Sequence, residues 1–268
     1  SEVLVRHTGP MAEDDALNTE RIRTEVFGHT LVVTMVRHTK RNAIDGEMTQ
    51  AIDAAMNRLD DDPELWVGIL TGGPDMFCAG TDMAATSGRP TERGGIYGVV
   101  GRHRAKPLIA AVEGVAFGGG FEVVMACDMV IAANNARFAL PEVKRGLVAS
   151  SGALFRASRV LPLNVAKYLL TTGTELSPVE AERHGLVNEV CEPGQALERA
   201  LALAEVITSN SPVAARLALQ AVDQIVAADD DRAWAISADF RNQVMASEDS
   251  KEGVAAFFEK RPPRWTGR

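Results

Sequence analysis

Short β-rich runs alternate with helical patterns along the first two-thirds of this 268-residue chain, and this alternation restricts the fold more than any other feature. We expect strands in the runs rich in Val, Ile, Leu and Thr, at 21–27, 30–36, 66–72, 108–114, 129–133 and 186–191. Residues 46–60 instead place Met48, Ile52 and Leu59 on one stripe of a helix. Strands that alternate with helices favour an α/β core.

The pattern changes after about residue 193, where helical stretches follow one another without a convincing strand. Pro212 suits the first turn of one of these helices, and Ser250 suits the N-cap of another. We therefore divide the chain into a flexible lead-in (1–20), an α/β core (21–193) and a helical region (194–268). A helical tail of this kind favours packing against a neighbouring subunit, although it can equally fold back on its own chain.

Composition narrows the classes of function. The net charge of −8 argues against a nucleic-acid surface, although 37–41 and 259–264 are locally basic. The three cysteines form no CxxC pair and the five histidines lack ligand spacing, so neither disulfides nor a metal site are expected. No apolar run is long enough to span a bilayer. The N-terminus resembles neither a signal nor a transit peptide, so a cytoplasmic location is expected.

Two glutamates stand out from their surroundings. Glu122 lies inside the apolar run "FEVVM" directly after Gly118–Gly120, where an ionised carboxylate is costly to bury or has a raised pKa. It can instead pair with a buried arginine or lie on an exposed helix flank. Glu142 follows Pro141, where a glutamate is also favoured simply because it begins a helix. If the two carboxyl groups converge on one pocket, they form a candidate acid/base pair.

Glycines beside these acids are suited to binding an oxyanion. Gly118–Gly120 leave backbone N–H groups exposed at a helix N-terminus, but their spacing matches neither GxGxxG nor a Walker A loop. Gly80, in "FCAGTDM" (77–83), permits a second close backbone approach after a predicted strand. Two N–H donors from separate loops would form an oxyanion hole, each contributing roughly 3–4 kcal/mol in a transition state. The run "GGIYGVVG" (94–101) contains GxxGxxG, a match too common to indicate a phosphate site.

Four segments resemble, in order, the signature segments of the crotonase superfamily, and most closely those of its enoyl-CoA hydratases. They are "LTGGPDMFCAGTDM" (70–83), "KPLIAAVEGVAFGGGFEVVMACDMVIA" (106–132), "ARFALPEVKRGL" (136–147) and "VAAFFEKRPPRW" (254–265). The similarity covers about residues 22–265. It implies an α/β fold made as a spiral of ββα units with a C-terminal helical trimerisation region. It also implies a homotrimer or a dimer of trimers, and an acyl-CoA thioester as substrate.

The resemblance also assigns roles to individual residues. It implies that the backbone N–H groups of Thr81 and Gly119 form the oxyanion hole. It places Arg41 at the CoA phosphates and lets Lys260 reach the nucleotide end from an adjoining subunit. The remaining implied contacts with the acyl-CoA are Ala79, Asp82, Met83 and Ala84.

The implied reaction is hydration of a trans-2-enoyl-CoA to the 3-hydroxyacyl-CoA. Glu122 acts as the base toward a water molecule that attacks the β-carbon, and Glu142 delivers a proton to the α-carbon. This chemistry requires no metal and no cofactor, because coenzyme A is part of the substrate.

One departure from the family pattern keeps alternatives open. The hydratases usually carry Gly-x-x-Pro-Gly-x-Gly-Gly after the second glutamate, whereas 146–153 read "GLVASSGA", with Ala149 and Ser150 at the Pro and Gly positions. An enoyl-CoA isomerase, or a dehydratase for a specialised acyl-CoA of the carnitinyl-CoA type, is therefore an alternative. An acyl-CoA-binding protein without catalysis is disfavoured because both glutamates are retained.

Overall fold

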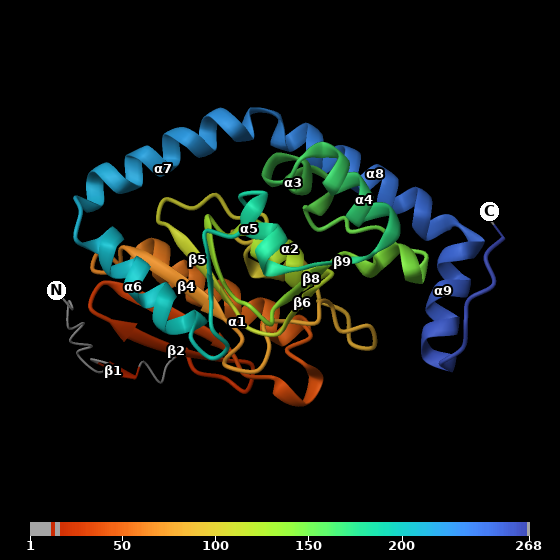
Figure 1. Ribbon diagram of the computed structural model, residues 1–268, viewed down its shortest axis with the longest axis horizontal. Coiled ribbons are helices and arrows are strands. Elements are labelled where there is room, and N and C mark those ends of the chain that lie inside the picture. The colour runs from red at the N-terminus through yellow and green to blue at the C-terminus, as the bar shows by residue number, and fades with distance from the viewer. Residues whose placement is uncertain (1–11, 14–16, 267–268) are drawn as a thin grey trace.

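A seven-stranded sheet forms the centre of the computed structural model, which describes residues 12–13 and 17–266 (Figure 1). β2 pairs antiparallel with β1 and β3, and all pairs from β3 onward are parallel. Each of the six predicted strand runs contains one of these strands. In spatial order they are β1 (Ala12–Glu13), β2 (Ile22–Phe27), β3 (Thr30–Met35), β4 (Val67–Thr71), β5 (Leu108–Val112), β7 (Met129–Ala133) and β10 (Glu189–Cys191).

Helices cover both faces of this sheet, which explains why its central strands β3, β4, β5 and β7 are almost uniformly apolar. On one face, the alanines of α6 (Ala196–Thr208) pack against Val32, Ile69 and Ile109. On the other face, α1 (Gly46–Asp61) buries the predicted stripe of Met48, Ile52, Ala55, Met56 and Leu59. Successive side chains of a strand point to opposite faces, so each strand contributes to both cores.

A second, three-stranded sheet sets the position of the two glutamates. β6 (Val115–Phe117) pairs parallel with β8 (Arg137–Ala139), and β8 pairs antiparallel with β9 (Glu175–Leu176). α2 (Gly119–Ala126) begins two residues after β6, and the 3₁₀ helix η3 (Pro141–Arg145) begins two residues after β8. Because adjacent parallel strands end at the same edge, both segments start side by side.

The remaining segments between the strands are short helices. Two are 3₁₀ turns, η1 (His38–Lys40) and η2 (Ile96–Gly98). Three α-helices follow the second glutamate: α3 (Ala153–Val160), α4 (Leu163–Thr172) and α5 (Pro178–Arg183). No helix in the described ranges is both long and apolar enough to cross a membrane.

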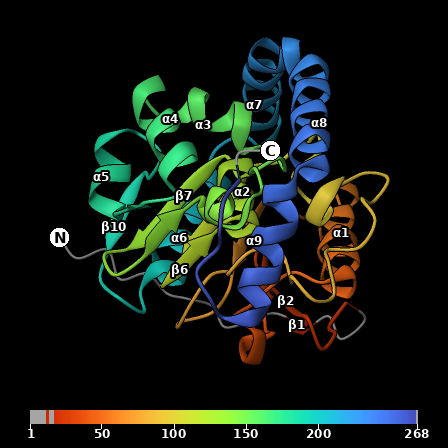
Figure 2. The same ribbon diagram turned by 90° about the vertical axis from the view of Figure 1, so that its right-hand side faces the viewer.

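Beyond Cys191 the described chain forms helices and no strand. The helices after α6 are α7 (Pro212–Val226), η4 (Ala227–Asp229), α8 (Asp230–Ala246) and α9 (Glu248–Glu259). α7 and α8 form a long arch over the α/β core (Figure 1), and they lie at the same edge in Figure 2. None of the residues of α7 is buried within the chain, and Ile225 is 77% exposed.

Pro212 lies at the first turn of α7, as predicted, but the predicted N-cap Ser250 is wrong. Ser247 caps α9, and its side chain accepts a hydrogen bond from the Ser250 amide at 3.0 Å. Both serines precede acidic or polar helix-forming residues, so the local pattern fits either one. Most of the predicted lead-in, residues 1–11 and 14–16, lies outside the described residues.

Candidate active site

Glu122 is buried in the first turn of α2, with 2% of its surface exposed. α2 is apolar on all sides and surrounded by protein, as expected for a core helix. One carboxyl oxygen of Glu122 accepts a hydrogen bond from the Ala153 amide at 3.2 Å. Burial raises the pKa of Glu122 well above the usual range, and the charge of Glu142 raises it further.

Glu142 faces the start of the same helix. A methyl group placed on Gly118, the N-cap of α2, would lie 3.0 Å from the Glu142 Oε1 atom. The Oε2 atom is buried and has no hydrogen-bond partner among the described residues. Burial also raises the pKa of Glu142. The structure therefore brings the two predicted acids together at the edge of β6 and β8.

The alternative in which Glu122 pairs with a buried arginine is wrong for the described part of the chain, where no ion pair joins either glutamate to a cation. Arg156 is the arginine that interacts electrostatically with Glu122, but its Nη2 donates to the Val100 carbonyl oxygen at 2.6 Å. Two neighbouring carboxyl groups that are both shielded from water favour a state in which they share one proton and one negative charge. This state supplies a base and an acid at the same place.

Two backbone amides lie beside this pair. Gly80 has a φ of +100°, and a methyl group there would lie 3.1 Å from the Gly119 nitrogen, so the two loops touch. The Gly119 N–H is in the first turn of α2, where amides have no acceptor within the helix. The Ile44 N–H donates to the Gly80 carbonyl oxygen, and the Ile44 carbonyl oxygen accepts the Asp82 N–H. The N–H of Thr81, which lies between Gly80 and Asp82 in the sequence, has no backbone partner in the described chain. The amides of Thr81 and Gly119 thus lie on two touching loops, and their role as an oxyanion hole stays a prediction.

The predicted acyl-CoA contacts fall into two groups. Ala79 and Met83 are half-buried and Ala84 is exposed on the segment that carries Thr81. The Asp82 carboxylate instead points to Arg37 at 2.7 Å, and this contact lowers its pKa to about 2. It also accepts a hydrogen bond from the Ala84 amide at 2.9 Å. Asp82 therefore holds the loop in shape rather than offering a free carboxylate.

The two predicted phosphate-binding cations are both exposed. Arg41 is next to the oxyanion segment, because its carbonyl oxygen accepts the Ala79 N–H at 3.0 Å. Lys260 is the C-cap of α9, and no described contact joins it to the residues above. Arg41 thus lies beside the 79–84 segment, and this segment touches the start of α2 at Gly80, whereas Lys260 lies apart.

Sequence reasoning missed two hydroxyl groups in this site. The Tyr97 hydroxyl lies 2.7 Å from the Thr81 Oγ1 atom, and the Ser151 hydroxyl donates to it at 3.2 Å. A methyl group on Gly119 would meet the Tyr97 hydroxyl oxygen at 2.5 Å. The sequence offers one weak signal, an aromatic residue inside a glycine-rich run. No group of three or more potential metal ligands (His, Cys, Asp or Glu) occurs in the described chain.

Comparison with known proteins assigns the family. Residues 28–268 match the model of the enoyl-CoA hydratase/isomerase family. The chain belongs to this family. It is 38% identical over 251 residues to enoyl-CoA hydratase EchA19 of Mycobacterium tuberculosis, covering 90% of this chain and 94% of that protein. It is 39% identical over 258 residues to carnitinyl-CoA dehydratase of Salmonella typhi, covering 90% and 96%.

The fold agrees with solved structures of this enoyl-CoA hydratase/isomerase family. The crystal structure of carnitinyl-CoA hydratase from Mycobacterium avium superposes with a TM-score of 0.88 at 38% identity, covering 94% of this chain and all of that chain. The predicted crotonase-type α/β fold is therefore confirmed. As a member of the enoyl-CoA hydratase family, the chain is an enzyme.

Proposed function

We propose that this enzyme adds water across the 2,3 double bond of a trans-2-enoyl-CoA and forms the 3-hydroxyacyl-CoA. The observation that carries the proposal is the pairing of the buried Glu122 carboxyl group with the half-buried Glu142, next to the backbone amides of Thr81 and Gly119. Acid and base at one place, beside donors for an oxyanion, are the groups that conjugate addition to a thioester needs.

The amides act on the thioester carbonyl. Hydrogen bonds from Thr81 and Gly119 polarise the carbonyl, which makes the β-carbon of the enoyl group electrophilic. They then stabilise the enolate oxygen, where negative charge develops in the transition state. Each donor is expected to contribute roughly 3–4 kcal/mol.

The carboxyl groups act on the water. With Glu122 ionised and Glu142 protonated, the water oxygen forms a bond to the β-carbon and its proton passes to Glu122. The electrons of the double bond move to the enolate and then form a C–H bond at the α-carbon with the proton from Glu142. After the reaction the pair still holds one proton, now on Glu122. This proton must return to Glu142 before the next turnover. The complete cycle consumes one water molecule and one enoyl-CoA and leaves the protein groups unchanged overall.

The exposed parts of the chain support our assignments for the CoA part of the substrate and for the assembly of subunits. We assign Arg41 to the CoA phosphates and Ala79, Asp82, Met83 and Ala84 to the loop along which the acyl-CoA lies. We assign Lys260 to the nucleotide of a substrate bound to an adjoining subunit. The exposed apolar side chains of α7 and α8 support a homotrimer or a dimer of trimers formed through 194–268. A cytoplasmic location stays a prediction.

The direct test is an absorbance assay of the purified enzyme with trans-2-enoyl-CoA thioesters, from crotonyl-CoA to longer chains. We expect loss of the conjugated enoyl absorbance and formation of 3-hydroxyacyl-CoA for at least one chain length. A folded enzyme that hydrates none of them would exclude the general hydratase.

A second candidate is favoured by the similarity to carnitinyl-CoA dehydratase and by Ser150, which stands where the hydratases usually have a glycine. Dehydration of a 3-hydroxyacyl-CoA with a specialised acyl group runs the same steps in reverse, with the same two glutamates. Assaying carnitinyl-CoA beside 3-hydroxybutyryl-CoA separates the two candidates. Faster dehydration of carnitinyl-CoA would select the specialised enzyme, and a shifted double bond without water uptake would select an isomerase.

The pH dependence tests the shared proton. Because burial raises both carboxyl pKa values, kcat/KM should follow a bell-shaped curve whose acidic limb lies well above the pH of about 4.3 at which an ordinary glutamate titrates. Activity falls on the acidic side because both groups become protonated and no base is left. It falls on the alkaline side because both become ionised and no acid is left. A pH profile that is flat from pH 5 to 9 would contradict this assignment.

A further inference from the structure

The glycine-rich segment 94–101 fixes the position of a buried tyrosine. Tyr97 adopts the left-handed conformation, with a φ of +57°, which is uncommon for a bulky residue and needs support from its surroundings. Gly98 provides part of this support, because a side chain there would meet the backbone of Asp53 in α1 at 2.7 Å. Only glycine lets the segment approach α1 this closely.

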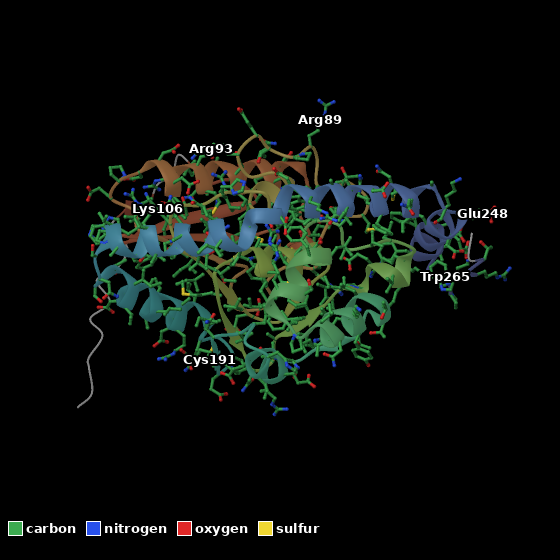
Figure 3. The ribbon with its side chains drawn as sticks, turned by 90° about the horizontal axis from the view of Figure 1, so that it is seen from above. Arg89, Arg93, Lys106, Cys191, Glu248 and Trp265 are labelled. Atoms are coloured by element: carbon green, nitrogen blue, oxygen red, sulfur yellow. The ribbon has the colours of Figure 1, made fainter. Side chains whose placement is uncertain are left out.

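Ion pairs hold the same segment to α1 from both ends. Arg102, whose side chain is 1% exposed, contacts Asp53 at 2.5 Å and Asp60 at 2.8 Å. Thr91 donates its hydroxyl to Asp53 at 2.8 Å, and Arg93 pairs with Asp61 on the surface. Figure 3 shows Arg89, by contrast, extending away from the molecule. The anchored part of the loop is therefore the part that carries Tyr97.

The anchored tyrosine places its hydroxyl between the two halves of the candidate site. Tyr97 is 3% exposed and Ser151 is 9% exposed. The Tyr97 hydroxyl lies 2.7 Å from Thr81 Oγ1 on the oxyanion segment and 3.2 Å from Ser151 Oγ on the loop before α3. The loop that carries Ser151 reaches Glu122, because the Ala153 amide donates to the Glu122 carboxylate at 3.2 Å. The amide and the hydroxyl of Ser151 also lower the pKa of Glu122 and so favour its ionised form.

We propose that Tyr97 is a positioning residue which connects the oxyanion segment to the catalytic base through the hydroxyl chain Thr81–Tyr97–Ser151–Glu122. When Glu122 is ionised, Ser151 donates to it, Tyr97 donates to Ser151, and Thr81 donates to Tyr97. When Glu122 holds the proton, the three hydroxyl groups donate in the opposite direction, and Ser151 donates to Tyr97. The chain thus follows the charge of the base during each catalytic cycle. This inference rests on the proposed role of Glu122.

The other groups that face Glu122 make this chain important. Glu142, from η3, disfavours the ionised form of Glu122, and burial does so more strongly. Arg156, from α3, interacts with Glu122 electrostatically without a hydrogen bond to it in the described structure. The Ala153 amide and the contacts of Ser151 are the hydrogen bonds that favour the carboxylate. Polarisation along a hydroxyl chain strengthens the last bond, so the Tyr97 hydroxyl supports the charge from a distance.

The test is Tyr97→Phe, which removes the hydroxyl and keeps the ring against Gly119. We expect kcat to fall about 3- to 10-fold, as for the loss of one neutral hydrogen bond, while KM changes less than 2-fold. The acidic limb of kcat/KM should move to higher pH, because Glu122 becomes harder to ionise. Tyr168→Phe is the matched control, since Tyr168 is 57% exposed and should leave both kcat and the pH profile unchanged.

A double-mutant cycle with Ser151→Ala tests whether the hydroxyls act as one chain. If they do, adding Tyr97→Phe to Ser151→Ala should change kcat by less than 2-fold, because the link is already broken. Multiplicative effects would overturn the proposal, as would a Tyr97→Phe variant that changes KM alone.

A readout independent of turnover covers the case in which hydration is not the reaction. The C=O stretch of protonated Glu122 can be titrated by infrared spectroscopy and assigned with Glu122→Gln. The titration midpoint of Glu122 should be higher in Tyr97→Phe than in wild type, and higher again in the single variant Ser151→Ala. Unchanged midpoints in both variants would overturn the proposed chain, whatever substrate the enzyme uses. If Tyr97→Phe does not fold, the Ser151→Ala midpoint alone decides.

Discussion

Glu122→Gln is expected to lower kcat for hydration by about 10²- to 10⁴-fold, the usual contribution of a general base, with little change in KM. Glutamine has the shape of glutamate and can still accept the Ala153 N–H, so the backbone around α2 should stay in place. It cannot take the proton of the attacking water. Steady-state kinetics with the best enoyl-CoA substrate measure this effect.

The stability of the same variant provides a second readout with a defined sign. The raised pKa of Glu122 means that the folded state binds its proton more tightly than the unfolded chain does. Wild type therefore loses stability as pH rises from the unfolded pKa of about 4.3 toward the folded pKa, and the full loss persists above it. Glu122→Gln lacks this penalty. The difference between its Tm and that of wild type should therefore become more positive as the pH is raised.

Glu113→Gln is the matched control. Glu113 is also a buried glutamate, with 3% exposure, but its Oε1 accepts the amides of Gly194 and Ala196 at 2.9 and 3.0 Å and serves the structure. We expect this variant to keep near wild-type kcat. If Glu122→Gln retained activity as well as Glu113→Gln does, Glu122 would not be the base.

Gly119→Ala is expected to have the second-largest effect, a fall in kcat of about 10²- to 10³-fold. The added methyl group would lie 2.5 Å from the Tyr97 hydroxyl oxygen and 2.7 Å from the ring carbon that bears it. Neither distance is tolerable, so α2 or the tyrosine must move, and the Gly119 N–H moves out of line with the thioester oxygen. Binding of a CoA thioester, measured by calorimetry, should change much less than kcat, because the amide acts mainly on the transition state.

Gly46→Ala is the control for this substitution. Gly46 is likewise the first residue of a helix, and a methyl group there meets only Gly88 at 3.5 Å, an ordinary contact. Its activity should match wild type. Retention of full activity by Gly119→Ala, too, would remove the oxyanion hole from the proposed mechanism.

Local sequence determined the secondary structure and one half of the site. The six strands β2, β3, β4, β5, β7 and β10 and the stripe of α1 follow from local hydrophobic patterns, whereas β6, β8 and β9 were not predicted. Glu122 was recognisable as a candidate because an ionised carboxylate inside "FEVVM" is costly to bury unless it is paired or its pKa is raised. The pattern of the signature segments then identified its partner, Glu142, which by itself is an ordinary helix-start residue.

Only the tertiary structure decided which groups share the site and which do not. Tyr97 and Ser151 are 54 residues apart, and nothing in the sequence links the two, yet their hydroxyls meet between Thr81 and Glu122. Asp82 was expected to line the acyl-CoA site, but its carboxylate is tied to Arg37, 45 residues away. Contacts of this range arise when β6 and β8 align their ends and when a glycine-rich loop packs on α1. Hydrophobic periodicity encodes which face of an element is buried, but it does not encode which polar atoms come within hydrogen-bond distance after the elements have packed.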